Sequence, residues 1–373
     1  MRVLHFFKTY YPDTFGGVER TIHAIAKGCT PLGIESHVLS LSSEPSKTSV
    51  TFDGHRAHKA KLDFELASTG FSFEVVGKFR KLSAQADIVH YHFPWPTMDI
   101  IHALYPPGKP TVVTYHSDIV KQASLLPLYS PLMHHFFSRV DRIIATSPNY
   151  LASSDILQRY RDKVEVIPIG LDQADYPRAP SHLTQVWKAR FPRPFFLFVG
   201  VLRYYKGLHT LIEAAANIDA DFLIAGTGPL EKELQQKASQ CASNVYFLGA
   251  IDDLDKAALF ELCTAFVFPS HLRSEAYGLS LVEAAMFGKP MISCEIGTGT
   301  SYVNRDRETG IVVPPEDSRA LEGALRHMLF SNNTVRYAAA AHKRFTCELQ
   351  ASVMAQRYYS IYAQLQRAHK RFH

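Results

Sequence analysis

The stretch RVLHFFKTYYPDTFGGVER, residues 2–20, joins a short apolar run, a polar loop and the start of a helix. Residues 2–7 are expected to form a strand, and the spacing of apolar residues predicts a helix from about 18 to 32. Such a strand–loop–helix unit is typical of the start of an α/β domain. Gly16 and Gly17 stand at the expected helix start, where glycine lets the backbone approach a ligand and free N–H groups favour an anion. A plain tight turn explains this pair equally well.

Short apolar runs continue this pattern through the first half of the chain. They predict further strands at residues 36–41, 87–92, 111–115, 142–145 and 164–167. Helical patterns lie between most of these runs, and strands that alternate with helices predict a mostly parallel sheet covered on both faces. Ligands of such sheets bind beyond the carboxyl ends of the strands, so the loops that follow strands are the first places to look for a site.

Histidines lie in two of these strand–loop regions. The stretch VHYHFPWP, residues 89–96, holds His90 and His92, and TYHSDIV, residues 114–120, holds His116. We expect His90 and His92 to lie on opposite faces of their strand, which argues against joint metal ligation, and we interpret both as ordinary hydrogen-bonded histidines. His116 comes immediately after a strand end, and there a functional role is the favoured interpretation.

The second half of the chain repeats the pattern after a proline-rich segment. Residues 173–194 hold four prolines and no long apolar period, which predicts an interdomain linker. The fold class is therefore α/β, with two Rossmann-like, doubly wound parallel-sheet domains that face each other across a cleft. We expect these domains at 1–172 and 195–349, and a C-terminal helix within 350–373 that returns to the first domain. The strands expected in the second domain are 195–199, 222–225, 245–248 and 265–268, with helices from about Gly207, Pro229, Leu254 and Leu279.

Two loops of the second domain have the composition of a phosphate site. In GVLRYYKG, residues 200–207, Arg203 and Lys206 stand where a strand gives way to a helix, and two cations beside free amides suit a diphosphate. A solvated basic loop is the alternative. The next loop, AGTGPLE, places Gly226 in the same relation to a later helix, although a packing turn would have the same sequence.

The stretch SEAYGLSLVE, residues 274–283, brackets a third loop with two glutamates. Glu275 is expected in the loop and Glu283 near the first turn of the following helix. The free N–H groups at this helix start, around Gly278 and Leu279, favour an anion. A carboxylate on either side would then hold the hydroxyl groups of whatever carries that anion. The acidic run at 252–255 resembles a metal-binding pair but is better explained as a helix cap, and we assign no metal.

Composition and charge argue against some classes of function and location. The chain has 373 residues, enough for two domains, and a net charge of +5 without a strongly basic domain, which argues against a nucleic-acid partner. Five scattered cysteines and the absence of a signal peptide or an apolar run long enough to cross a bilayer predict a cytoplasmic protein. The basic residues near the C-terminus and the aromatic-rich segment 125–140 leave a peripheral contact with the inner membrane open, beside the plainer interpretations of solvated tail and core packing.

Taken together, these loops resemble glycosyltransferase family 4, the retaining nucleotide-sugar transferases with two facing Rossmann-like domains, a fold known as GT-B. The resemblance covers nearly the whole chain, and its most specific part is the pair Glu275 and Glu283 with seven residues between them. The sequence departs from the family at one position, because many members have arginine where Val201 stands, whereas here the arginine is Arg203. The other matching positions are Gly16, Gly17, His116, Lys206, Gly207, Gly226, Thr227, Gly228 and Pro229.

The resemblance implies a role for each matching residue. Lys206 and Arg203 would hold the donor diphosphate, and Glu283 the ribose hydroxyls. Glu275 would bind the transferred sugar, together with His116 and the amides around Gly278 and Leu279. The remaining implied donor contacts are Gly16 and Gly17 from the first domain, and Gly226. His116, Glu275, Lys206 and Arg203 form the implied catalytic set, no divalent metal is needed, and the sugar is transferred with retention.

Within the family, the stretches at residues 8–20, 89–96 and 114–120 resemble bacterial mannosyltransferases of O-antigen and exopolysaccharide assembly. This implies GDP-mannose as the donor and a saccharide, free or linked to polyprenyl diphosphate, as the acceptor. A transferase that uses a UDP-sugar is the first alternative. A glycoside hydrolase would not need two diphosphate-binding loops, and a nicotinamide-dependent dehydrogenase would need the full G-x-G-x-x-G fingerprint. A scaffold subunit of a polysaccharide assembly complex is the remaining alternative, and it would need no intact site.

Overall fold

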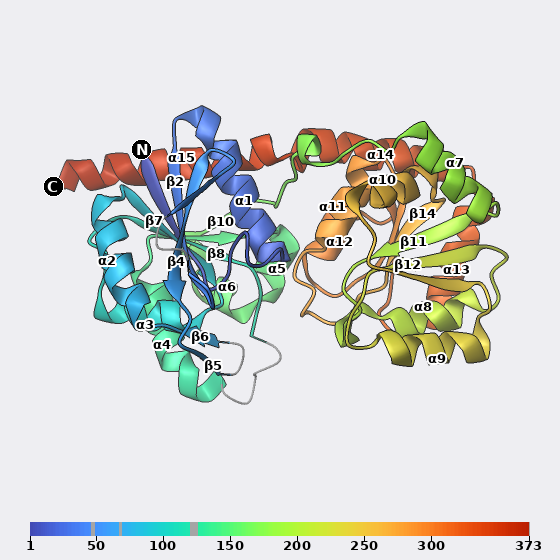
Figure 1. The fold of residues 1–373 in the computed structure, drawn as a ribbon, viewed down its shortest axis with the longest axis horizontal. Coiled ribbons are helices and arrows are strands. Elements are labelled where there is room, and N and C mark those ends of the chain that lie inside the picture. Colours follow the sequence, from blue (N-terminus) through green and yellow to red (C-terminus); the bar gives the residue numbers. More distant parts are fainter. Residues whose placement is uncertain (46–48, 67–68, 120–125, 373) are drawn as a thin grey trace. The chain divides into compact units, whose positions relative to one another are not determined.

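The structure is a computed structural model that describes residues 1–45, 49–66, 69–119 and 126–372 (Figure 1). The chain forms two compact units: residues 1–170 with 351–373 make up unit 1, and residues 171–350 make up unit 2. Each is an α/β structure built on its own, largely parallel sheet, so the prediction of two α/β, mainly parallel-sheet domains is confirmed. Three residues within segments named above, Val120, Leu125 and His373, lie outside the described residues.

An eight-stranded sheet in the order β10-β9-β8-β7-β1-β2-β4-β3 forms the centre of unit 1. Neighbouring strands are parallel, except that β3 and β4 pair antiparallel. β5 (Phe64–Leu66) and β6 (Thr69–Phe71) pair antiparallel in a separate two-stranded sheet. The strands of the large sheet are β1 (Arg2–Phe6), β2 (Glu35–Ser42), β3 (Val50–Phe52), β4 (His55–Lys61), β7 (Ile88–Phe93), β8 (Thr111–Tyr115), β9 (Arg142–Ala145) and β10 (Val164–Val166).

Helices cover both faces of this sheet. On one face, α1 (Gly17–Cys29) packs against α15 (Ala351–Phe372). On the other face, α2 (Glu74–Gln85) and α4 (Leu126–Arg139) pack against β1 and β7 through aromatic contacts. α4 buries Met133, Phe136 and Phe137, which confirms core packing for these three residues of segment 125–140, whereas Leu128 is exposed. The remaining helices are α3 (Pro96–Leu104), α5 (Pro148–Ser153) and α6 (Asp155–Arg159).

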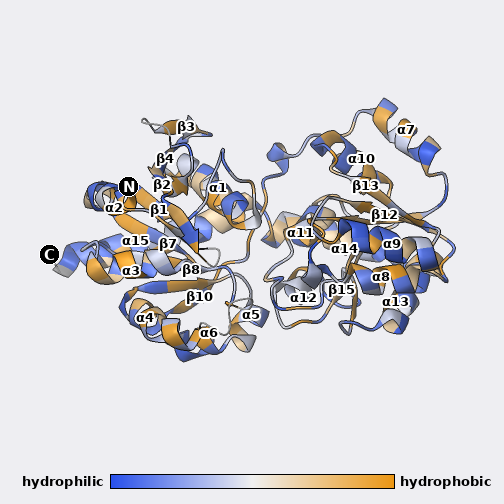
Figure 2. Ribbon diagram, turned by 60° about the horizontal axis from the view of Figure 1, so that its bottom comes forward, coloured by the Kyte–Doolittle hydropathy of each residue, from blue (hydrophilic) through white to orange (hydrophobic). Residues whose placement is uncertain are grey.

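Unit 2 contains a six-stranded parallel sheet in the order β13-β12-β11-β14-β15-β16. The sequence predicted its first four strands and missed the last two. Figure 2 shows that hydrophobic residues follow the central strands of each unit. The strands are β11 (Phe195–Val199), β12 (Asp221–Ala225), β13 (Val245–Gly249), β14 (Ala265–Phe268), β15 (Met291–Cys294) and β16 (Gly310–Val313).

The helices of unit 2 also lie on both sides of its sheet, as a doubly wound domain requires (Figure 1). On one side, α8 (Leu208–Ala215) contacts α9 (Glu231–Cys241) and α13 (Ser318–Phe330). On the other side, α10 (Asp253–Leu262) contacts α7 (Ser181–Arg190), and α11 (Leu279–Met286) contacts α14 (Asn333–Glu348). The short α12 (Gly299–Val303) precedes β16.

Residues 173–194, expected as a linker, are part of the folded structure of unit 2. They include the short helix η4 (Gln173–Asp175) and α7, whose Trp187 is 7% exposed and donates a 2.7 Å hydrogen bond to Asp255. Asp252 accepts a hydrogen bond from the backbone N–H of Asp255 at the start of α10, so its predicted role as a helix cap is confirmed. In the part of the chain that the structure describes, no helix has both the length and the apolar character of a membrane span.

Candidate functional site

Two loops of unit 2 meet where the strand order of its sheet reverses. β11 pairs with β12 on one side and with β14 on the other, and the loops after β11 and β14 lead into α8 and α11. A doubly wound sheet binds its ligands in the crevice at this position. The predicted diphosphate loop and the stretch SEAYGLSLVE are therefore neighbours at this sheet edge, although Lys206 and Glu275 are 69 positions apart in sequence.

Lys206 and Glu275 form a buried ion pair between the two loops. Nζ of Lys206 donates to Oε2 of Glu275 over 2.5 Å, and the two side chains are only 10% and 12% exposed. The same ammonium group lies 4.5 Å from the centroid of the Phe268 ring, a favourable cation–π distance. An anion that approaches Lys206 therefore competes with the carboxylate of Glu275 for the ammonium group.

Glycines allow the loops at this edge to touch through their backbones. Gly207 has a φ of 66°, and a Cβ atom there would lie 2.0 Å from the carbonyl oxygen of Pro269. Gly226 has a φ of 131°, and its Cβ would lie 2.1 Å from the carbonyl oxygen of Gly200. Both distances are far below the van der Waals contact distance, so any larger residue would push the loops apart. Donor binding by Gly226 stays a prediction.

We expect Gly226→Ala to lower the free energy of unfolding of unit 2 by about 1–3 kcal/mol, because it adds a backbone clash in a left-handed conformation. Gly323 provides a matched control within α13, where an added Cβ would meet no heavy atom within 4 Å. Gly323→Ala should raise stability by about 0.5–1 kcal/mol. Thermal denaturation without ligand measures both, and equal shifts in the two variants would contradict the packing role of Gly226.

The helix start between the two glutamates has no side-chain cap. α11 begins after Gly278, whose φ of 84° is left-handed and which, as glycine, provides no side-chain cap to the first turn. The preceding loop is fixed by Thr298, whose hydroxyl donates to the carbonyl of Glu275 over 2.8 Å, and by a 2.9 Å backbone bond from Gly299 to Ala276. The N–H groups at Gly278 and Leu279 therefore lie at the positive end of the α11 dipole, and the loop before this helix is held in place by hydrogen bonds.

Glu283 belongs to a different cluster from Glu275. Its side chain is 3% exposed, and Oε1 accepts hydrogen bonds from Tyr176 over 3.1 Å and from Lys256 over 3.4 Å. The ring of Tyr176 also lies 5.1 Å from Nζ of Lys256. The structure thus separates the two glutamates into two ion pairs. Sequence reasoning missed Tyr176 and Lys256, because neither belongs to a motif around Glu283.

The arginines of the two loops differ in their surroundings. Arg203 is exposed, and within the described residues its side chain forms no hydrogen bond or ion pair. Arg273 was not among the predicted site residues, but it lies two positions before Glu275 and donates to the carbonyl of Gly297 over 3.2 Å. The structure does not bring Arg203 into contact with Lys206 through its side chain, so its part in a diphosphate clamp stays a prediction.

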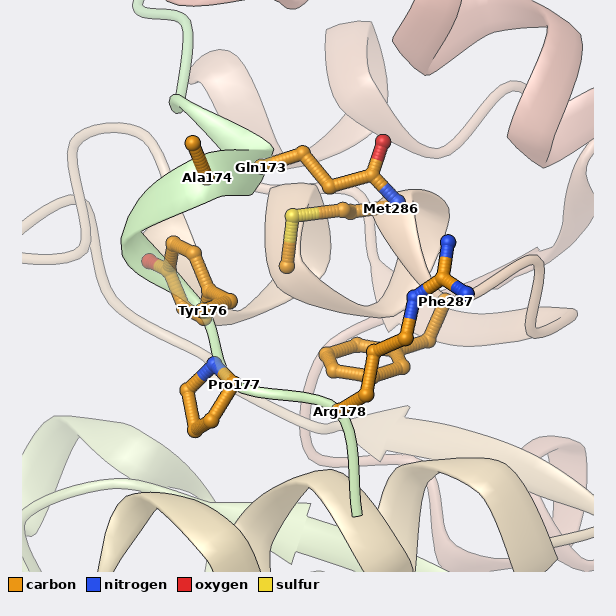
Figure 3. Close-up of a pocket in the computed structure, with 7 residues that line it drawn as sticks. All are labelled: Gln173, Ala174, Tyr176, Pro177, Arg178, Met286 and Phe287. Carbon is orange, nitrogen blue, oxygen red and sulfur yellow. The ribbon is translucent and has the colours of Figure 1, made fainter.

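A pocket of about 440 Å³ lies near the C-terminal end of α11, on the other end of that helix from Gly278 (Figure 3). None of the predicted site residues lines it. Its lining residues are Gln173, Ala174, Tyr176, Pro177, Arg178, Met286 and Phe287. Tyr176 connects this pocket to Glu283 through the hydrogen bond described above.

The predicted glycines of unit 1 lie beside an acidic side chain. Gly16 caps α1 with extended backbone, and Gly17 is the first residue of the helix. Glu19 in the first turn is 7% exposed and accepts a 2.8 Å hydrogen bond from Thr14. An added Cβ at Gly16 would lie 2.5 Å from Oε2 of Glu19, so the carboxylate occupies the space next to this glycine. Approach of a donor to Gly16 and Gly17 stays a prediction.

His116 lies just beyond β8, and its backbone N–H donates to Phe93 over 3.0 Å. The residue is 6% exposed, and burial lowers the pKa of its imidazole to about 3. Nε2 of His116 lies 2.9 Å from Nδ1 of His92. His116 is therefore a neutral ring at ordinary pH, held by a second buried histidine that the sequence had not connected to it.

The expectation that His90 and His92 lie on opposite faces of their strand is wrong. Side chains two positions apart along a strand point to the same face, and the two ring centroids are only 4.3 Å apart. Ligand nitrogens of His5, His90 and His92 lie within 4.8 Å of one another, close enough to hold a metal ion. A second such group in the described residues combines His209, His271 and Glu316. The interpretation of His90 and His92 as hydrogen-bonded histidines is confirmed, because His90 bonds with Thr114 and Tyr362, and His92 with His5 and His116.

Comparisons with known proteins cover both units. Residues 15–175 match the family model described as Glycosyltransferase Family 4, and residues 184–344 match the model described as Glycosyl transferases group 1. D-rhamnosyltransferase WbpZ of Pseudomonas aeruginosa is 54% identical over 327 residues, which is 87% of this chain and 86% of that protein. O-antigen chain mannosyltransferase C of Escherichia coli is 46% identical over 367 residues, or 98% of this chain and 99% of that protein.

Solved structures of lower sequence identity have the same fold. Sucrose-phosphate synthase from Thermosynechococcus elongatus superimposes with a TM-score of 0.82 at 19% identity, and the match covers 98% of this chain and 99% of that one. Anabaena HepE, solved in complex with UDP, gives a TM-score of 0.77 at 19% identity over 98% of this chain and 100% of that one. The fold is thus that of the GT-B glycosyltransferases. This chain belongs to glycosyltransferase family 4 and is a glycosyltransferase.

Proposed function

We propose that this enzyme transfers a mannose residue from GDP-mannose, with retention, to a saccharide acceptor in the synthesis of O-antigen. The observation that carries the proposal is the 46% identity to an O-antigen chain mannosyltransferase over nearly the full length of both chains. The buried Lys206–Glu275 pair at the switch point of unit 2 supports it, because a nucleotide-sugar site needs a cation for the diphosphate beside an acceptor of sugar hydroxyl bonds.

Within this proposal, Lys206 and Arg203 neutralise the diphosphate, and the N–H groups around Gly278 and Leu279 bind its oxygens. Glu275 accepts hydrogen bonds from the transferred sugar, and Glu283 from the ribose. When the bond between the sugar C1 and the diphosphate oxygen breaks, the electron pair stays on that oxygen, and the cations stabilise the charge. The acceptor oxygen then bonds to C1 on the same face, and its proton passes to the departing phosphate oxygen. With protein cations in this role, no divalent metal enters the reaction.

A second donor sugar is favoured by the relative of 54% identity, which is named for D-rhamnose. D-Rhamnose is the 6-deoxy form of D-mannose, so the two sugars differ by one hydroxyl group. Discrimination against a missing hydroxyl depends on whether the site holds a buried hydrogen-bond partner for it. GDP-D-rhamnose is therefore the second candidate, ahead of UDP-sugars.

We propose that the acceptor saccharide is linked to polyprenyl diphosphate, which places the reaction at the cytoplasmic face of the inner membrane. The last turn of α15 supports a peripheral contact, since it carries His369, Lys370 and Arg371 beside one another. Basic clusters are attracted to anionic lipid surfaces by about 1 kcal/mol per charge near the surface.

The test of this function is a thermal-shift panel of GDP, UDP, ADP and CDP and of their sugars, followed by transfer assays with the sugars that bind. A ligand that binds the folded state alone raises the melting temperature by mass action, by the equivalent of about 2.7 kcal/mol at a hundred times its dissociation constant. We expect GDP and GDP-mannose to give the largest shifts, and GDP-mannose to support transfer. Transfer from UDP-sugars alone would contradict the donor assignment, and hydrolysis of a plain glycoside without nucleotide would contradict the transferase.

A further inference from the structure

A chain of buried histidines runs through unit 1 to the candidate residue His116. His5 lies on β1 and His92 on the adjacent β7, and both are 0% exposed. Nδ1 of His5 lies 3.1 Å from Nε2 of His92, and Nδ1 of His92 lies 2.9 Å from Nε2 of His116. Three imidazole rings are thus joined by two hydrogen bonds, with His116 at the end nearest the C-terminal edge of the sheet.

Each ring in this chain is neutral at ordinary pH. Burial lowers the pKa of His5 and of His116 to about 3 and that of His92 well below its usual value. A neutral imidazole has one N–H donor and one acceptor nitrogen. Both hydrogen bonds must therefore run in the same direction along the chain, because His92 cannot donate through both nitrogens or accept through both.

His5, at the far end of the row of three histidines, decides the direction of the two hydrogen bonds. Nε2 of His5 is fully buried and has no hydrogen-bond partner among the described residues. If the bonds ran from His116 towards His5, this nitrogen would carry a proton with no acceptor. If they run from His5 towards His116, it carries only an unused lone pair. Orphaned buried N–H groups are rarer in proteins than acceptors with an unused lone pair, so the second direction is favoured.

We propose that His92, itself aligned by His5, is a positioning residue that fixes His116 in the tautomer with its proton on Nδ1. In this state Nε2 of His116 accepts from His92 and has no free lone pair. His116 then presents an N–H donor beyond the end of β8 and cannot act there as a general base. This inference rests on the proposed function in one respect, namely that the oxygen which receives this donor belongs to the transferred sugar.

His90 is close to this chain but does not take part in it. Its Nε2 lies 2.7 Å from the hydroxyl of Thr114 and its Nδ1 lies 2.7 Å from the hydroxyl of Tyr362 in α15. It is as buried as His92, lies on the same face of β7, and has two partners of its own. His90→Gln is therefore a matched control that disturbs the same layer of the core without removing a bond to His116.

The direct test is long-range ¹H–¹⁵N NMR of the full chain with ¹⁵N-labelled histidine, with His116 assigned through a His116→Gln sample. We expect His116 to carry its proton on Nδ1 at about pH 8 and about pH 6. In His92→Leu it should shift towards the Nε2–H tautomer that free imidazole side chains favour in water. His92→Asn, whose amide N–H can replace Nδ1–H of His92, should restore the Nδ1–H state, and His90→Gln should leave it unchanged.

Turnover supplies the second readout. We expect kcat to fall about 10-fold in His92→Leu, with KM for the donor changed less, and to recover in part in His92→Asn. A wild-type His116 with its proton on Nε2 would overturn the proposal, as would one zinc ion per chain held by His5, His90 and His92. The wild-type spectrum needs no variant to fold and no substrate. An Nδ1–H signal in a protein without transferase activity would therefore refute the proposed function and leave the histidine chain in place.

Discussion

Lys206→Ala should weaken the binding of GDP by about 100-fold, because it removes a cation that the structure fixes near the end of the predicted diphosphate loop, just before α8. Calorimetry with GDP measures this change directly. The exposed lysine of the Lys237–Glu213 pair in the same unit serves as the control, and Lys237→Ala should leave GDP affinity unchanged. Unchanged affinity in Lys206→Ala would remove this residue from the diphosphate site.

The ion pair with Glu275 makes a second variant necessary. Removing only Lys206 leaves a carboxylate that is 12% exposed without its partner, and breaking a buried pair from one side costs about 3–5 kcal/mol. The double variant Lys206→Met with Glu275→Gln removes both charges and should recover most of that stability. It should still bind GDP weakly. Recovery of GDP affinity along with stability would mean that Lys206→Ala acted through folding alone.

Glu275→Gln should have the opposite pattern, with turnover reduced about 100-fold or more and GDP affinity unchanged or improved. The amide keeps the shape of the side chain but loses the charge that, in the proposed function, accepts hydrogen bonds from the sugar. It also frees the ammonium group of Lys206, which the carboxylate holds at 2.5 Å, for the diphosphate. Steady-state kinetics and calorimetry on the same preparation separate these two effects.

Glu283→Gln is the matched comparison, because the carboxylate of Glu283 is also buried but has different partners, Tyr176 and Lys256. We expect it to raise KM for the donor more than it lowers kcat, as loss of a ribose contact would. An equal loss of turnover and GDP affinity in Glu275→Gln would contradict its assignment to the sugar. A loss confined to kcat in Glu283→Gln would contradict the assignment of Glu283 to the ribose.

Local sequence determined the elements whose signals are contiguous. The strands expected at 111–115, 142–145, 195–199 and 265–268 have the bounds that the structure shows, because runs of apolar, mostly β-branched or aromatic residues encode a buried parallel strand without help from the rest of the chain. The cap at Asp252 is a local signal of the same kind, since its partner is three residues away. Short motifs also indicated the family, and with it the class of reaction.

Strands that depend on long-range pairing could not be predicted from the sequence. β4, with the sequence HRAHKAK, has no apolar run and no period-2 alternation, and it becomes a strand through its pairing with β2. β15 and β16 have the sequences MISC and GIVV, in which serine, cysteine or glycine interrupts the apolar run that marks β9 and β14, strands of the same length. Their pairing within the sheet, rather than local preference, makes them strands.

The sequence by itself determined two α/β domains, the loops at their strand ends and the residue types of the proposed nucleotide-sugar site. Only the tertiary structure decided which of those residues touch. It paired Lys206 with Glu275, assigned Glu283 to Tyr176 and Lys256, and joined His116 to His92. The physical reason is that hydrogen bonds and ion pairs form between atoms a few ångströms apart, and the sheet brings together loops that are distant in sequence.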